Sequence, residues 1–85
     1  MKLTTIQDQA IQARMAGLVG ADVFDRLFIG IHFDEMYDTM LYAFVEDEAK
    51  AAEIEDEFSL HIAAIASMVL KKHVEIVLVM PKVLQ

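Results

Sequence analysis

Apolar side chains recur at intervals of three and four between residues 46 and 72, and this spacing predicts a long amphipathic helix. The charges at the two ends of the segment fit the helix dipole. Acidic residues stand at the start, where the dipole is positive, and Lys71, Lys72 and His73 stand at the end. The apolar stripe consists of Ala51, Ile54, Phe58, Ile62, Ile65 and Val69.

The beginning of the chain predicts a shorter helix over residues 5–19. Thr5 and Asp8 have the spacing of a capping box, in which two side chains bond the free backbone N–H groups of the first turn. No proline interrupts the segment, and Gly20 is a suitable end because glycine adopts the backbone conformation that closes many helices.

Two apolar segments, 27–33 and 74–80, are predicted to be strands. Residues 74–80 are rich in β-branched side chains, and Pro81 should end the strand because proline has no N–H for the ladder. Since side chains alternate between the two faces of a strand, one face of the segment 27–33 carries Leu27, Ile29, Ile31 and Phe33.

The segment 36–45 fits two patterns. As a helix it would align Met36, Tyr37, Met40, Leu41, Phe44 and Val45. As a strand, after a hairpin turn at 34–38, it separates Leu41, Ala43 and Val45 from Met40, Tyr42 and Phe44. We favour the strand, because the other two strands need a sheet and an unbroken helix over 35–72 would be unusually long.

These elements predict an α+β fold in one domain, residues 1–85, with the order αββαβ. We expect two layers: a three-stranded, mostly antiparallel sheet with both helices on one face. If residues 2–4 added a strand the fold would be ferredoxin-like, and if 36–45 were helical it would be mostly α. The predicted helix-facing residues are Leu27, Ile29, Ile31, Phe33, Val74, Ile76, Leu78 and Met80.

The second face of such a sheet would be apolar and aromatic. A patch of this kind is typical of a protein interface, unless the first helix or the tail 82–85 covers it. The predicted interface residues are Phe28, His32, Met40, Tyr42, Phe44, Val77 and Val79.

Composition is consistent with a folded domain that has apolar surface to spare. Of the 85 residues, 56% are hydrophobic and 25% are charged, which is too apolar for a disordered chain. No cysteine is present to form a disulfide or a thiolate site. The N-terminal residues lack a signal-peptide pattern, and the longest segment without acidic or basic residues, 58–70, is shorter than the roughly 20 residues that span a bilayer. We therefore expect a cytoplasmic protein that does not insert into membranes.

The net charge of −7 comes from one segment. Ten acidic residues stand between positions 34 and 57, against Lys50 alone. Such a field disfavours direct nucleic-acid binding and attracts basic protein surfaces. The acids either keep an apolar protein soluble or imitate nucleic acid in a basic groove. The predicted acidic face consists of Asp34, Glu35, Asp38, Glu46, Glu53, Asp56 and Glu57.

Motifs for chemistry are weak. Gly17-Leu18-Val19-Gly20 has the spacing of a backbone-clamping GxxG loop, but its middle residues are apolar, which favours a helix end. A metal site at His32, Asp34, Glu35 and Asp38 matches no known ligand spacing. The two serines fall within the long predicted helix and outside any nucleophile motif. We therefore expect no catalytic residue, cofactor or metal.

Together these patterns predict a non-enzymatic protein-binding module that forms a homodimer through the apolar sheet face. The alternative is an acidic inhibitor of the phage type, which mimics nucleic acid and blocks a basic groove of a nucleic-acid-handling protein.

Overall fold

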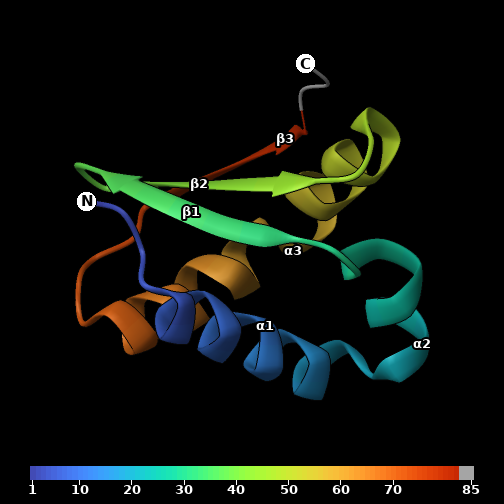
Figure 1. Cartoon of the computed structure of the whole chain (residues 1–85), viewed down its shortest axis with the longest axis horizontal. Coiled ribbons are helices and arrows are strands. Elements are labelled where there is room, and N and C mark those ends of the chain that lie inside the picture. The colour runs from blue at the N-terminus through green and yellow to red at the C-terminus, as the bar shows by residue number, and fades with distance from the viewer. Residues whose placement is uncertain (83–85) are drawn as a thin grey trace.

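A computed structural model describes residues 1–82 as a three-stranded sheet covered on one face by helices (Figure 1). The predicted α+β class, the three-stranded sheet and its helical layer are confirmed. The elements, in chain order, are α1 (Thr5–Val19), α2 (Ala21–Val23), the π-helical turn η1 (Phe24–Phe28), β1 (His32–Tyr37), β2 (Met40–Val45), α3 (Glu48–Leu70) and β3 (Ile76–Pro81).

Helix α1 has the predicted bounds, with its cap one residue earlier than expected. The Thr4 hydroxyl accepts from the Gln7 N–H at 3.1 Å, and the Gln7 side chain accepts from the Thr4 N–H at 2.9 Å. Helix α3 is two residues shorter than predicted at each end. Its N-cap is Asp47, whose carboxylate accepts from the Lys50 N–H at 2.8 Å, and its C-cap is Lys71, whose φ of 56° ends the helix.

The predicted strand at 27–33 is wrong. Phe28 is the last residue of η1, and the chain turns at Gly30, whose φ of 80° suits glycine, before β1 starts at His32. The alternating apolar residues suggested a strand because Leu27 and Ile31 are both buried in the core. Leu27, however, belongs to the helical turn η1, and Ile31 belongs to the loop before β1.

The predicted hairpin turn at 34–38 is also wrong, because most of that segment is strand. The turn is formed by Asp38 and Thr39 alone, and Tyr37 pairs directly with Met40. Asp38 has a φ of 57°, which aspartate tolerates better than most residues. Residues 36–45 thus form the end of β1, the turn and β2, which rules out the mostly-α alternative.

Strand β2 lies in the centre of the sheet, antiparallel to β1 and parallel to β3, so the sheet is mixed rather than mostly antiparallel. The parallel pair arises because α3 carries the chain back to the end of the sheet where β2 began. At the outer edge of β1, Lys2 forms one isolated bridge with Glu35 and no strand, so the ferredoxin-like condition is not met.

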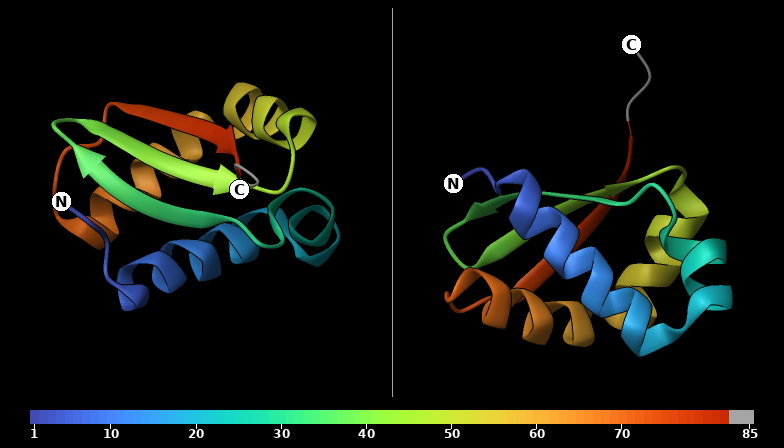
Figure 2. Two further views of the ribbon diagram at one scale, coloured as in Figure 1. Left: turned by 45° about the horizontal axis from the view of Figure 1, so that its top comes forward. Right: turned by 60° about the horizontal axis from the view of Figure 1, so that its bottom comes forward.

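The core lies between the sheet and helices α1 and α3, which sit side by side on the same face (Figures 1 and 2). From β2 it receives Leu41, Ala43 and Val45, as predicted for a strand with one buried face. From β3 it receives Val77 and Val79, whereas the predicted core residue Ile76 is 46% exposed. Ile29, also predicted to face the helices, is 51% exposed.

Candidate protein-binding face

The face of the sheet opposite the helices of residues 1–82 is apolar along two strands. Helix α1 does not cover it, and residues 83–85 of the tail that was expected to cover it lie outside the described residues. Six side chains of β2 and β3 lie on this face in cross-strand register, with Met40 beside Ile76, Tyr42 beside Leu78 and Phe44 beside Met80. All six are partly or fully exposed. We call this surface the open face, and it consists of Met40, Tyr42, Phe44, Ile76, Leu78 and Met80.

Strand β1 adds a more polar flank to the open face. Its residues Tyr37, Glu35 and His32 pair with Met40, Tyr42 and Phe44, respectively. A β-bulge between Phe33 and Glu35 gives this register, because it inserts Asp34 as an extra residue. The apolar part of the sheet surface therefore ends at β1.

The structure brings three of the seven predicted interface residues to the open face, Met40, Tyr42 and Phe44, and places a fourth, His32, on its flank. The other three, Phe28, Val77 and Val79, are at most 6% exposed and belong to the core. Phe28 is buried because η1 turns it under α3, where its ring meets the Phe58 ring edge-on with centroids 5.4 Å apart.

For β3, the residues predicted for the two faces of the strand are exchanged. Residues 76–80 are all apolar, so the sequence gives no contrast between one face and the other. In the structure Val77 and Val79 face the helices, and their neighbours Ile76, Leu78 and Met80 take their place on the open face. These three residues of the open face were not predicted, because a run of apolar residues carries no signal for which face each one takes.

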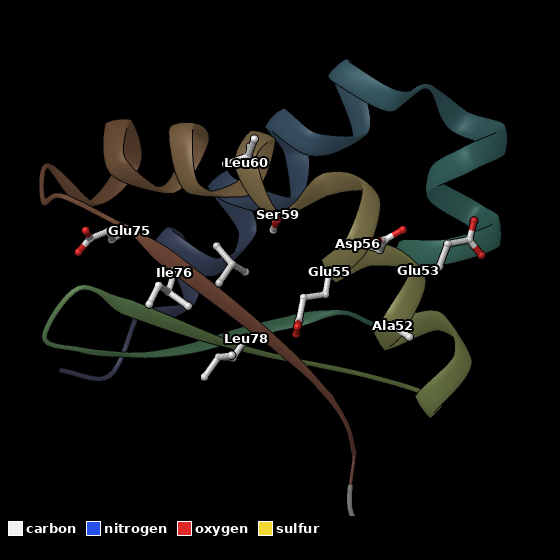
Figure 3. Close-up of a pocket in the computed structure, with 10 residues that line it drawn as sticks. Ala52, Glu53, Glu55, Asp56, Ser59, Leu60, Glu75, Ile76 and Leu78 are labelled. Carbon is white, nitrogen blue, oxygen red and sulfur yellow. The ribbon is translucent and has the colours of Figure 1, made fainter.

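A groove of about 910 Å³ adjoins the open face where β3 meets α3 (Figure 3). Ile76 and Leu78 belong to both surfaces, so the apolar area continues around the edge of the sheet. From α3 the Glu55 side chain points at the strand, and its carboxylate accepts from the Val79 N–H at 2.9 Å. The residues that line the groove are Ala52, Glu53, Glu55, Asp56, Ser59, Leu60, Glu75, Ile76, Val77 and Leu78.

A polar cluster connects the start of β1 to α1. Asp8 is 7% exposed, and its carboxylate accepts from the Phe33 N–H at 2.8 Å and lies 3.0 Å from His32 Nδ1. The other ring nitrogen of His32 lies 3.1 Å from Asp34. All three side chains are thus occupied by one another and by the backbone, which indicates a role in holding β1 in place.

Asp34 also forms an ion pair with Lys2, with Nζ and Oδ2 2.9 Å apart. The hydrogen bond from Lys2 lowers the pKa of Asp34 below its usual value, against a smaller opposing effect of burial. The same bond raises the pKa of Lys2 above its usual value.

The predicted acidic face is divided in space. Asp38 lies at the hairpin turn, whereas Glu46 follows β2 at the opposite end of the strand. A strand of six residues is about 20 Å long, so the two acids are about that far apart. Glu53, Asp56 and Glu57 lie on α3 beyond Glu46. Three of the seven acids have basic partners in the chain: Asp34 with Lys2, Glu46 with Lys50, and Glu53 with Arg26.

The side chains considered for metal binding or nucleophilic catalysis make contacts within the fold. Among residues 1–82, no group of three or more His, Asp or Glu side chains has a geometry that would hold a metal ion. The Ser67 hydroxyl donates to the Ala63 carbonyl at 2.7 Å and accepts from the Val74 N–H at 3.1 Å, so it fastens the end of α3 to the next loop.

Comparison with known proteins gives no family for the chain. No protein-family model matches it, and no curated protein matches it either. Within the described residues, no helix has both the length and the apolar character needed to cross a membrane.

Proposed function

We propose that this chain is a non-enzymatic protein-binding module that self-associates through the open face. The observation that carries the proposal is the six-residue apolar surface of β2 and β3, on the side of the sheet that no helix covers (Figure 2). Neither strand contributes an acidic or basic side chain to it. Apolar surface exposed in this way gains free energy when a second surface removes it from water.

A second copy of the chain fits this surface better than a charged partner does. Two open faces present the same uncharged side chains, so stacking them leaves no ionised group from β2 or β3 unpaired. The polar and charged residues beside the open face, His32 and Glu35 on β1 and Lys82 after β3, lie at its margin. An interface with an apolar centre and a polar margin is the usual arrangement.

The size of the face indicates a weak dimer. Three strands of six residues cover about 14 Å by 20 Å, or roughly 300 Å² in projection. A standard interface buries about 800 Å² on each partner. The dimer should therefore be in reversible exchange with the monomer, and its population should depend on protein concentration.

Sedimentation velocity between about 10 µM and about 1 mM tests the proposal. We expect the average mass to rise with concentration, and Met40→Lys to weaken the association at least about tenfold, because it buries a charge in the interface. Met68→Lys is the matched control, since Met68 is 61% exposed on α3 and far from the sheet surface. Its association should stay within about threefold of wild type. A wild-type chain that remains monomeric throughout this range contradicts the proposal.

The alternative function, an acidic inhibitor that mimics nucleic acid, has less support. The seven acids are spread over β1, the hairpin turn and the far end of the sheet with α3, and three of them are in ion pairs within the chain. The two functions differ in their response to salt. Apolar self-association should be similar in about 50 mM and about 500 mM NaCl, whereas capture of a basic protein should weaken steeply over that range.

A further inference from the structure

We propose that Glu55 is an intramolecular lock on the free edge of β3, which keeps this edge from pairing with the same edge of a second copy. The inference does not rest on the proposed function, because the edge and the open face are different surfaces. An exposed edge strand normally offers a row of unpaired N–H and C=O groups to any other strand.

The backbone pattern of β3 defines which groups the edge offers. The N–H groups of Ile76 and Lys82 point toward β2 and its turn, where they bond Thr39 and Val45 carbonyls at 3.3 and 2.8 Å. Backbone groups alternate along a strand, so the N–H groups of the odd-numbered residues point outward. The outward donors are therefore Val77 and Val79, because Pro81 has no N–H.

Glu55 occupies one of these two donors. Its Oε2 accepts from the Val79 N–H at 2.9 Å, and Figure 3 shows the side chain reaching from α3 to the strand. An antiparallel pair of β3 strands around a twofold axis would set Val77 opposite Val79 of the second copy and would need the N–H of both. With Glu55 in place, half of those donors are already bonded.

The negative charge beside the β3 edge also disfavours pairing with a second copy. Four carboxylates line the groove beside β3, from Glu53, Glu55, Asp56 and Glu75, and among residues 1–82 only Glu53 of these four has a basic partner, Arg26. A twofold pairing of β3 edges would bring two such groups together, and like charges disfavour that approach. The lock therefore combines an occupied donor, a proline and a repulsive rim.

Amide hydrogen exchange in the wild-type monomer, followed by NMR, tests the contact without any substitution. Val77 and Val79 have buried side chains on the same strand and outward N–H groups, so each is a control for the other. We expect the Val79 amide to exchange at least about tenfold more slowly than the Val77 amide. Equal rates would overturn the proposed lock.

Variants of Glu55 in the Met40→Lys background test the consequence, because that background weakens the open face. Glu55→Ala should strengthen association at least about tenfold by freeing two donors per dimer. Glu55→Gln keeps an acceptor oxygen and should stay within about threefold of the background. Asp56→Ala removes the same charge from the groove without touching Val79.

The proposal fails if Glu55→Ala associates no more strongly than Asp56→Ala. It also fails if Glu55→Gln associates as strongly as Glu55→Ala, because charge rather than the hydrogen bond would then control the edge. Failure of the open-face proposal has a different signature. If the open-face proposal is wrong, Met40→Lys will associate as strongly as the wild type, whatever residue stands at position 55.

Discussion

At the scale of single residues, the buried Asp8 side chain connects α1 to β1 through hydrogen bonds. Asp8 is the only polar residue among the buried side chains of residues 1–82. Its carboxylate accepts from the Phe33 N–H and from Gln12, and it contacts His32. A buried polar group is tolerated when it is bonded in this way, and removing one partner leaves the other unsatisfied.

Asp8→Ala should lower the free energy of unfolding by about 2–3 kcal/mol, because it leaves the Phe33 N–H without a partner inside the molecule. Urea unfolding followed by circular dichroism measures the change. The control is Asp25→Ala, an exposed acid of η1, which should change the free energy by less than about 0.5 kcal/mol. Equal effects of the two substitutions would show that the Asp8 contacts do not stabilise the fold.

The ion pair of Lys2 and Asp34 gives stability a pH dependence with a definite sign. Because folding lowers the pKa of Asp34 below 3.8, the contribution of this group is present above that pH and is lost as the pH falls through the folded pKa. Because folding raises the pKa of Lys2 above 10.5, its contribution is present below that pH and is lost as the pH rises through the folded value.

Lys2→Gln should therefore raise the pKa of Asp34 and destabilise the fold at neutral pH more than at pH values below the folded pKa of Asp34. An NMR titration of the Asp34 carboxyl group, with unfolding measured at neutral and acidic pH, checks both effects. An unchanged Asp34 titration in the variant would show that the ion pair does not form in solution.

At the scale of elements, the path between α1 and β1 depends on backbone conformations that few residues adopt. Gly20 has a φ of 88° at the end of α1, and Gly30 has a φ of 80° just before β1. Gly17 lies within α1 instead, where no neighbouring atom would meet an added Cβ. These glycines should respond to alanine in opposite ways, according to the backbone at each position.

Gly30→Ala should lower the free energy of unfolding by about 1–2 kcal/mol, because alanine is strained at positive φ. Gly17→Ala should raise it by about 0.5–1 kcal/mol, because alanine is favoured within a helix. Thermal and urea unfolding of the two variants measure both signs. A destabilised Gly17→Ala chain would mean that α1 makes a close contact at this position in solution.

At the scale of the whole molecule, both edges of the sheet are partly blocked and one face is open. At the β1 edge, the Leu3 N–H donates to the Asp34 carbonyl at 2.9 Å, and the Met36 N–H donates to the Met1 carbonyl at 2.8 Å. At the β3 edge, Glu55 accepts from the Val79 N–H and Pro81 has no N–H, so Val77 alone among the odd-numbered residues 77–81 keeps an outward donor. This arrangement favours association through side chains of the open face over association through backbone pairing, which supports the proposed function.

The sequence by itself determined the elements with strong periodicity. Helices α1 and α3 follow from the capping pattern and uninterrupted sequence of the first and from the apolar stripe of the second. These patterns repeat over many residues within one element, so they predict that element without information about its contacts with the rest of the chain. The segment 36–45 fitted both a helix and a strand, so β2 was predicted only because the other strands needed a sheet.

Only the tertiary structure decided how β3 is rotated, where β1 begins and which side chains reach the open face. All side chains of residues 76–80 are apolar, so packing against α3 chose Val77 and Val79 for the core. The burial of Phe28 depends on Phe58, thirty positions along the chain, and the bond between Glu55 and Val79 joins two elements that meet only after folding. Contacts between distant segments carry no local signal, because the sequence fixes each partner separately and only the folded chain brings them together.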